Sequence, residues 1–499
     1  MLKKVKSFFF ENISTRQTVA KNAFWLAVSN FGGRFIRATI VIYAARVLGP
    51  SEWGVFNYTI TIVTFLTLFV DSGINQVVIR DRSQAVNEDE KRVKTATAFY
   101  LKLILLAIGA VIIVGFAPLL PTADAFTTEK AAVLFPIMVF IMIFDAVREF
   151  FHAVLRSEER MEWEAVSYGL TNVWIVAFGF AFLSVHPTVR GFTAAYALGT
   201  GLGVLGAAVI ARKYIAHIFT GFSKEVMKKL FREIWPYTIS SALGMLMINT
   251  DIIMLGWFGS SQEVGWYSAP QRIVQLIYLI PSVISVSILP VFSRLAAQSK
   301  EKMTQAIEKG VSIMYMVALP VAVGGIIVAT PLVELLFGSA FTPGVIAFQI
   351  LLLSLLADFS AVLLSNTLLA QHRQKKLVIY SGIGGSINVL LNLLLIPRIG
   401  IAGCALATLG AQIVSNTYLQ YTVRQIHPFH IWRHLTIAVQ GTLAMALAVF
   451  FLQIQGVNVI VTITVGAFIY LSVLFLRREP LVQEIKQSLF GNPLRNIPE

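Results

Sequence analysis

The sequence predicts an all-α polytopic membrane protein with about fourteen transmembrane helices. Of its 499 residues, 56% are hydrophobic and the mean hydropathy is +0.74, which is more apolar chain than a soluble core needs. A helix needs roughly 20 apolar residues to cross about 30 Å of hydrocarbon, and about fourteen stretches reach that length. Lysine and arginine recur in every second gap between these stretches, which independently supports an even number of spans.

The expected spans follow one another with short connections along almost the whole chain. They cover residues 21–47, 53–79, 94–118, 130–154, 163–185, 191–211, 234–256, 264–293, 310–336, 344–370, 377–396, 401–423, 434–454 and 457–476.

The cations fix the orientation of these spans. Of the 40 lysines and arginines, 31 lie in the N-terminal segment, the even gaps or the C-terminal tail, four lie in odd gaps and five lie within spans. By the positive-inside rule both termini are cytoplasmic, as expected for a multi-pass protein of the plasma membrane. The net charge of +14 then borders the spans and needs no nucleic-acid partner.

Several kinds of chemistry are excluded by the same pattern. Cys404 is the only cysteine, so no intrachain disulfide or cysteine-based metal site is expected, and no cofactor or metal is predicted. The gaps are too short for a soluble catalytic domain, which argues against an enzyme. The one G-x-G-x-x-G run, at 201–206, lies inside the sixth span with no strand before it, so it indicates helix packing.

The chain repeats a short motif after its first and seventh spans. Residues 52–56 read EWGVF and residues 263–267 read EVGWY, and basic amphipathic segments at 2–10 and 223–235 precede the two units. Six spans separate the motifs, which predicts parallel repeats related by an axis along the membrane normal. The alternative is a chance similarity between two short turns.

The second amphipathic segment has its own prediction. Val226, Met227, Leu230, Phe231 and Ile234 fall on one helical face, so the segment is expected to lie on the cytoplasmic membrane surface.

Segments in order along residues 16–425 resemble the polysaccharide biosynthesis family of lipid-linked oligosaccharide flippases, which includes the O-antigen repeat-unit flippases. The first half is carried by the runs at 22–25, 46–54 and 71–76. The second half is carried by NTD at 249–251, EVGWYSA at 263–269, LFG at 336–338 and IPRIGIAGCALAT at 396–408.

This family belongs to the multidrug/oligosaccharidyl-lipid/polysaccharide (MOP) exporter superfamily, and the resemblance implies an architecture. Two six-helix lobes of the MATE type are expected around a central cavity, at 1–217 and 218–430, followed by two further helices and a cytoplasmic tail at 431–499. It also implies alternating access, in which the lipid tail stays in the bilayer while the headgroup crosses through the cavity.

Charges inside the membrane are where function is sought, because each is costly unless it faces a cavity or a partner. Arg34 and Arg37 lie three residues apart, hence on one face of the first span, and guanidinium forks match phosphate oxygens. They are candidates for binding a lipid diphosphate headgroup; the alternative is an ion pair with a neighbouring helix. Arg272, in the eighth span, is a candidate for approaching the same cavity.

The other intramembrane charges have competing interpretations. Arg148 is a further candidate for the headgroup, or a mutual surface pair with Glu149, and Lys102 is expected to snorkel to the cytoplasmic interface. Four acids are candidates for partnering the arginines or binding a driving ion such as H⁺ or Na⁺, with the membrane potential as another energy source. These acids are Asp71, Asp145, Asp251 and Asp358.

The leading hypothesis is a flippase that moves a polyprenyl-diphosphate-linked oligosaccharide from the cytoplasmic to the outer leaflet for cell-surface glycan synthesis. Its expected partners are that lipid-linked substrate, the bilayer, and a polysaccharide polymerase or glycosyltransferase. The alternative with the same fold is a cation-coupled multidrug exporter, which would favour acids over arginines in its cavity. A membrane-integral sugar transferase is a third hypothesis, which the short loops oppose.

Overall fold

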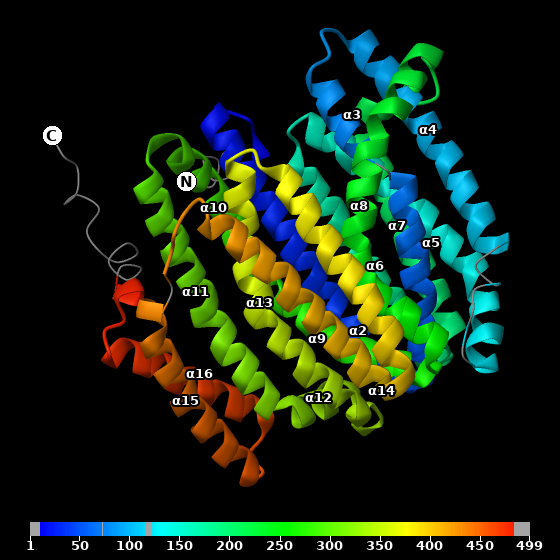
Figure 1. Ribbon diagram of the computed structural model, residues 1–499. Coiled ribbons are helices and arrows are strands. Elements are labelled where there is room, and N and C mark those ends of the chain that lie inside the picture. The colour runs from blue at the N-terminus through cyan, green and yellow to red at the C-terminus, as the bar shows by residue number, and fades with distance from the viewer. Residues whose placement is uncertain are drawn as a thin grey trace. The chain divides into compact units, whose positions relative to one another are not determined.

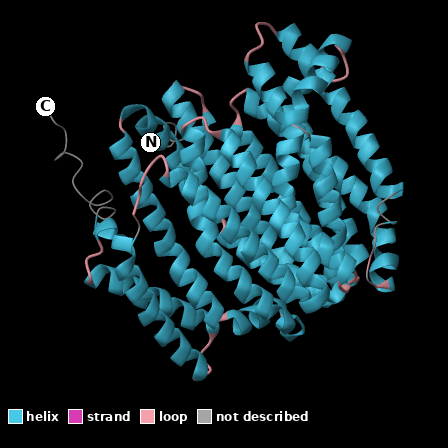
Figure 2. Ribbon diagram, in the orientation of Figure 1, coloured by secondary structure: helices cyan, strands magenta, loops and turns pink. Residues whose placement is uncertain are grey.

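The computed structural model describes residues 10–71, 73–115, 119, 122, 124–430 and 432–483, and its regular elements there are all helical (Figure 2). The all-α membrane fold expected from the sequence is confirmed. The basic positions Lys3, Lys4, Lys6, Lys486 and Arg495 lie outside the described residues.

The chain divides into two compact units, at residues 1–269 and 270–499 (Figure 1). The lobe boundaries expected near 217 and 430 stay predictions. The helices of the first unit are α2 (Thr15–Asp71), α3 (Ile74–Ser83), α4 (Glu88–Gly115), α5 (Ala125–Ser157), α6 (Met161–Val185), α7 (Val189–Ile215), α8 (Lys224–Phe258) and the first part of α9 (Ser261–Ile277).

The second unit continues from α9 and holds the remaining helices. These are α10 (Leu279–Gln298), α11 (Lys300–Ile327), α12 (Ala329–Phe337), a short 3-10 helix η2 (Ser339–Gly344), α13 (Val345–Ala370), α14 (Gln374–Arg424), α15 (Trp432–Ile454) and α16 (Val459–Leu476).

Two of the longest helices are each a pair of expected spans joined at a kink. In α2 the kink is at Gly49, whose φ of 73° places it in the left-handed region, and Pro50 follows it. In α14 it is at Ile399 and Gly400, two residues after Pro397. The kinks fall in the gaps expected at 48–52 and 397–400, so each long helix accounts for two spans.

Within the first unit, α6 packs against α7 and α2, and α7 also packs against α5. In the second unit α13 packs against α14 and α11, while α15 and α16 lie side by side (Figure 1). The Tyr470 hydroxyl of α16 donates a 2.6 Å hydrogen bond to the Met316 carbonyl of α11, which ties the two C-terminal helices to that unit.

The start of α8 differs from the expected surface helix. Leu230 and Ile234 are buried, and Val226 and Met227 pack with them against a core built from α3, α4, α5 and α7. Phe231 is instead 62% exposed. The apolar face of this segment therefore covers other helices rather than a membrane surface, because the ends of those helices offer a nearer apolar partner.

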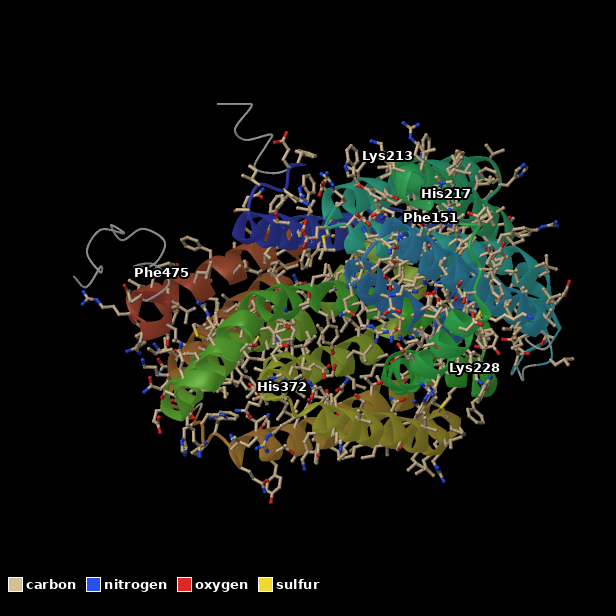
Figure 3. All side chains as sticks on the ribbon, turned by 90° about the horizontal axis from the view of Figure 1, so that it is seen from above. Phe151, Lys213, His217, Lys228, His372 and Phe475 are labelled. Atoms are coloured by element: carbon tan, nitrogen blue, oxygen red, sulfur yellow. The ribbon has the colours of Figure 1, made fainter. Side chains whose placement is uncertain are left out.

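The same end of the first unit carries exposed basic residues. Lys213, His217 and Lys228 are exposed, and in the view from above Lys213 and His217 lie around the end of α7, whereas Lys228 of α8 lies apart from them (Figure 3). Arg80 of α3 forms an ion pair with Glu233 of α8. The hydrogen bond to the Glu233 carboxylate raises the pKa of the Arg80 guanidinium above its ordinary value. The start of α8 is thus fixed to its own unit by both apolar and ionic contacts.

In the second unit, His427 fixes the loop between α14 and α15. Its Nδ1 lies 2.9 Å from the Thr304 hydroxyl of α11, and its Nε2 contacts the Gln371 side-chain amide. An amide N–H that donates to Nε2 requires the neutral ring. Burial and the positive charges of Lys300 and Arg373 accordingly hold the pKa of His427 below its ordinary value.

Candidate functional site

Arg34 and Arg37 of α2 lie in different surroundings although they are neighbours on one helical face. The Arg37 Nε donates a 2.8 Å hydrogen bond to the Asn172 side-chain carbonyl of α6. Asn172 is itself oriented by a 2.7 Å hydrogen bond from its Nδ2 to the Tyr168 backbone carbonyl. Arg34 is exposed, and no hydrogen bond or ion pair joins it to any described residue.

An exposed arginine at the centre of a predicted span is informative in itself. A guanidinium at the middle of a bilayer is costly unless it faces water or a partner. Since Arg34 has no partner among the described residues, we expect this face of α2 to line an aqueous path rather than lipid.

The ring of Tyr168 is shared by two guanidinium groups. The Arg37 carbon Cζ lies 5.8 Å from the ring centroid, and that of Arg148 on α5 lies 5.6 Å from it. Tyr196 of α7 adds a second ring at 5.6 Å from Arg37. At this distance the ring face attracts a cation. The helices α2, α5, α6 and α7 of the first unit thus hold two positive charges near one another.

Gly33 allows α2 to approach this ring. A Cβ atom at Gly33 would clash with the Tyr168 ring and would lie 2.8 Å from the Asn172 side-chain nitrogen. The absence of a side chain at this position therefore places Arg37 within reach of α6.

Arg148 is not the surface residue that one interpretation assumed, because its side chain is only 5% exposed. Its Nη1 lies 2.6 Å from the Asp145 carboxylate, and its Nη2 lies 3.6 Å from that of Glu149. Asp145 thus forms an ion pair with Arg148 on its own helix, and its role in binding a driving ion stays a prediction.

The guanidinium groups keep unused hydrogen-bond donors. Among the described residues, Nη2 of Arg37 and Nε of Arg148 are buried without an acceptor, and Nη1 of Arg148 has only the poorly aligned Asp145 carboxylate beside it. A buried N–H without an acceptor typically costs about 1–3 kcal/mol. The site is therefore incomplete without acceptor oxygens, and phosphate groups supply several of these in a geometry that guanidinium matches.

Further charges continue from Arg148 along α5. His152 lies 3.5 Å from the Glu149 carboxylate through Nδ1 and 3.0 Å from the Ser167 hydroxyl through Nε2. Arg156, one turn further on, donates a 2.8 Å hydrogen bond from Nε to Glu164. The buried site is thus continuous with a chain of polar side chains toward the end where α5 and α6 meet.

The remaining candidates lie elsewhere. Asp71 pairs with Lys102 rather than with an arginine, and the Lys102 side chain is fully buried, so the expectation that it snorkels was wrong. Lys102 also lies 3.4 Å from the Asn75 side-chain oxygen. Two nearby oxygens make burial less costly than reaching the interface.

Two candidate acids accept hydrogen bonds from hydroxyl groups. Asp251 accepts one of 2.8 Å from Tyr267, and Asp358 in the second unit accepts from Tyr278 and, at 3.3 Å, from Asn416. Among the described residues no lysine or arginine pairs with Asp358.

Arg272 donates a 3.1 Å hydrogen bond to Gln275 on its own helix. Its approach to the site of Arg37 stays a prediction.

Sequence reasoning missed four residues of the site, namely Tyr168, Asn172, Tyr196 and His152. Tyr168 and Asn172 are one turn apart within an apolar span, and a pair of polar side chains at that spacing is a signal that could have been read.

Comparison with known proteins decides the family. The model of the polysaccharide biosynthesis protein family matches residues 19–296, which is more than half of the chain. The chain belongs to this family. The MatE model matches residues 236–394 as well.

Members of the superfamily share this fold. The chain is 23% identical to the probable low-salt glycan biosynthesis flippase Agl15 of Haloferax volcanii, over 96% of this chain and 99% of that protein. The structure of the lipid II flippase MurJ in an inward closed conformation aligns with a TM-score of 0.75 and 17% identity, over 93% of this chain and 98% of that one. An inward-facing MATE multidrug transporter of the MOP superfamily aligns with a TM-score of 0.64 and 16% identity, over 85% and 98%.

Proposed function

We propose that this protein is a flippase that carries a polyprenyl-diphosphate-linked oligosaccharide from the cytoplasmic to the outer leaflet by alternating access. The observation that carries the proposal is the pair of guanidinium groups of Arg37 and Arg148 around Tyr168. Among the described residues, Nη2 of Arg37 and Nε of Arg148 are buried without an acceptor. Diphosphate oxygens would accept those hydrogen bonds, and Arg34 lies one turn away on the same helix. Family membership supports the same substrate class.

Transport rather than catalysis is proposed for the site. Its residues are suited to holding an anion. The phosphate would be released when the carboxylate of Asp145 or Glu149 takes its place at the Arg148 guanidinium. Charge-assisted hydrogen bonds contribute about 1.5–3 kcal/mol each, so losing those of Arg37 should weaken headgroup binding about 10- to 150-fold.

The test uses cells in which the native protein is depleted and replaced by variants. With Arg37→Gln or Arg148→Gln, we expect a lipid-linked glycan to accumulate on the cytoplasmic face. Arg37→Lys should be intermediate, because it keeps the charge but loses the fork. Arg46→Gln, the same charge change near the far end of the same predicted span, is the matched control and should behave as wild type.

The proposal fails if the arginine variants show no accumulation at normal protein levels. The identity of the lipid-linked glycan that accumulates on depletion alone would name the sugar and its carrier.

For the energy source we propose coupling to H⁺ or Na⁺, with Asp358 as the site. An acid that binds a driving ion cannot hold a permanent cation, and Asp71 and Asp145 already pair with Lys102 and Arg148. Asp358→Asn should abolish the response of transport to an imposed H⁺ or Na⁺ gradient, whereas Ser354→Ala, one turn away on α13, should not. A gradient response that survives Asp358→Asn would remove this residue from the proposal and leave the membrane potential as the alternative.

The second candidate function is a cation-coupled drug exporter, which the MatE match at residues 236–394 favours. Resistance to cationic drugs on overexpression, with no effect on lipid-linked glycans, would support it instead. For either function we propose a plasma-membrane protein with both termini in the cytoplasm. As a flippase, its partners would include a polymerase or glycosyltransferase that uses the delivered glycan.

A further inference from the structure

The start of α8 has a second face besides the apolar one that packs against the first unit. A helix turns by about 100° for each residue, so positions 224, 228, 231, 232 and 235 fall within an arc of about 100°. This arc lies apart from the buried side chains of Leu230 and Ile234. The segment therefore carries a basic–aromatic stripe, made of Lys224, Lys228, Phe231, Arg232 and Trp235.

The stripe is left uncovered by the described residues. Phe231 is 62% exposed and Trp235 is 57% exposed, although both rings are large and apolar. The three cations are exposed as well, and no ion pair joins them to a described residue. Lys229, outside the arc, instead lies 3.9 Å from the Glu233 carboxylate. Exposed rings beside such cations indicate a surface that meets a partner.

The length of α8 brings the stripe to the edge of the bilayer. Its 35 residues rise by about 52 Å, whereas the hydrocarbon is about 30 Å thick. With Phe258 at the predicted exterior boundary, roughly the first fourteen residues lie beyond the hydrocarbon at the opposite end. Trp235 is then nearest to the acyl chains, Arg232 lies about one turn further out, and Lys224 is the most distant.

An anionic lipid surface fits this order of residue types. Aromatic rings favour the boundary between headgroups and acyl chains, and cations next to a span favour the phosphate layer. Anionic lipids in the cytoplasmic leaflet create a negative potential that attracts such basic segments. A protein partner would need acids at matching positions, whereas lipid phosphates adjoin every span at this depth. The charge and the position of the stripe thus both favour lipid.

We infer that the basic–aromatic stripe binds the headgroups of anionic phospholipids and anchors the start of α8 to the leaflet predicted to be cytoplasmic. The bound lipid is not carried across the membrane, so the inference goes beyond the proposed function. Each cation close to the surface should favour an anionic over a neutral lipid by up to about fivefold. Because this attraction fades within a Debye length of about 8 Å, Lys228 and Arg232 should contribute more than Lys224.

The main test identifies the lipid that lies beside the stripe. The photoreactive ring of p-benzoylphenylalanine is placed at Phe231, where it keeps an aromatic side chain, in purified protein in vesicles of equal phosphatidylglycerol and phosphatidylcholine. After illumination, mass spectrometry counts the lipid adducts. We expect at least about three phosphatidylglycerol adducts for each phosphatidylcholine adduct. The same ring at Phe468, a position of α16 that is 71% exposed, is the control and should react with both lipids about equally.

Charge variants locate the preference on the stripe. Lys228→Gln with Arg232→Gln should bring the adduct ratio close to one, and Lys224→Gln alone should change it less. Arg212→Gln with Lys213→Gln removes the same charge from exposed positions near the end of α7 and should leave the ratio unchanged. Lys213 lies apart from Lys228, which makes this pair the matched control (Figure 3).

Replacement of Trp235 is an independent readout. Trp235→Ala should lower both kinds of adduct together and keep their ratio, because the ring sets the depth of the stripe and not its charge preference. A ratio that falls with Trp235→Ala as far as with the loss of the two cations would contradict this division.

Other outcomes would overturn the inference. Equal adducts with the cations intact, or a ratio that survives the loss of Lys228 and Arg232, would show that the stripe does not select anionic lipid. No lipid adduct at Phe231, with normal adducts at Phe468, would place water or a protein there instead. With a polyprenyl diphosphate added, adducts mainly with that lipid would make the stripe a substrate site. The test requires no transport, so its failure and that of the proposed function are distinguishable.

Discussion

Tyr168 is the residue whose replacement tests the site most selectively. Its ring holds both Arg37 and Arg148, and no hydrogen bond of its hydroxyl group joins it to a described residue. A cation–π contact contributes about 0.5–1 kcal/mol when exposed and about 2 kcal/mol when desolvated. With about 1 kcal/mol for each of the two contacts, Tyr168→Leu should cost about 2 kcal/mol in headgroup affinity, or about 30-fold. Tyr168→Phe keeps the ring and should stay within about threefold of wild type.

The assay is flipping of a fluorescent polyprenyl-diphosphate-linked sugar in proteoliposomes, with the half-saturating concentration as the readout. The order wild type, Tyr168→Phe, then Tyr168→Leu is expected. Equal damage by both variants would place the function in the hydroxyl group rather than the ring. No effect of Tyr168→Leu at normal protein levels would refute the shared-ring site.

Three predictions concern stability, measured by thermal unfolding in detergent. Lys102→Met should lower the free energy of unfolding by about 3 kcal/mol because the half-buried Asp71 loses its cation, and adding Asp71→Asn should recover most of that loss. No recovery would mean that the pair is not coupled. The pKa of His427 is lower in the folded state than in the unfolded state. The stabilisation that the neutral His427 ring provides should therefore be complete above about pH 6.5 and be lost as the pH falls through the lower folded-state pKa. A His427→Gln protein with the same acid sensitivity would contradict this. Asp124→Ala should lower the free energy of unfolding by about 1–2 kcal/mol, because the starts of α5 and α9 both lose their cap, and Asp124→Asn should lower it less. Equal losses in the two variants would show that the hydrogen bonds accepted by this side chain do not stabilise the fold.

The pH range over which Asp124 stabilises the protein follows from its hydrogen bonds. Burial acts to raise its pKa, but hydrogen bonds from Thr127 and Ser261 outweigh burial and hold the pKa below the ordinary value. Its stabilisation is therefore present above about pH 4 and lost as pH falls through the lower folded value.

Much of the fold was readable from the chain because lipid imposes a simple rule. Each span needs about 20 apolar residues, and cations remain on one side. The breaks at Gly49 and Gly400 were also readable, since glycine and a nearby proline end helices locally. These features depend on neighbours in sequence, which a single chain shows directly.

Features that depend on distant neighbours were not readable. Arg37 meets Asn172 across 135 positions, and Lys102 finds Asp71 across 31, so neither partner follows from local pattern. The start of α8 has the composition of a surface helix, but the ends of α4, α5 and α7 offered its apolar face a protein partner. The repeat motif was visible in sequence, whereas the close approach of its two copies at Gly54 and Gly265 required the structure.

Transport is measured most directly with the purified wild-type protein in liposomes that carry a fluorescent polyprenyl-diphosphate-linked oligosaccharide in both leaflets. A membrane-impermeant quencher removes only the outer-leaflet signal at first. Within the time of the assay, nearly all the fluorescence should become quenchable with the wild-type protein, and only about half with Arg37→Gln or in empty liposomes. If the inner-leaflet half of the fluorescence stays unquenched with the wild-type protein under an H⁺ gradient, a Na⁺ gradient and a membrane potential alike, the protein is not a flippase for this lipid.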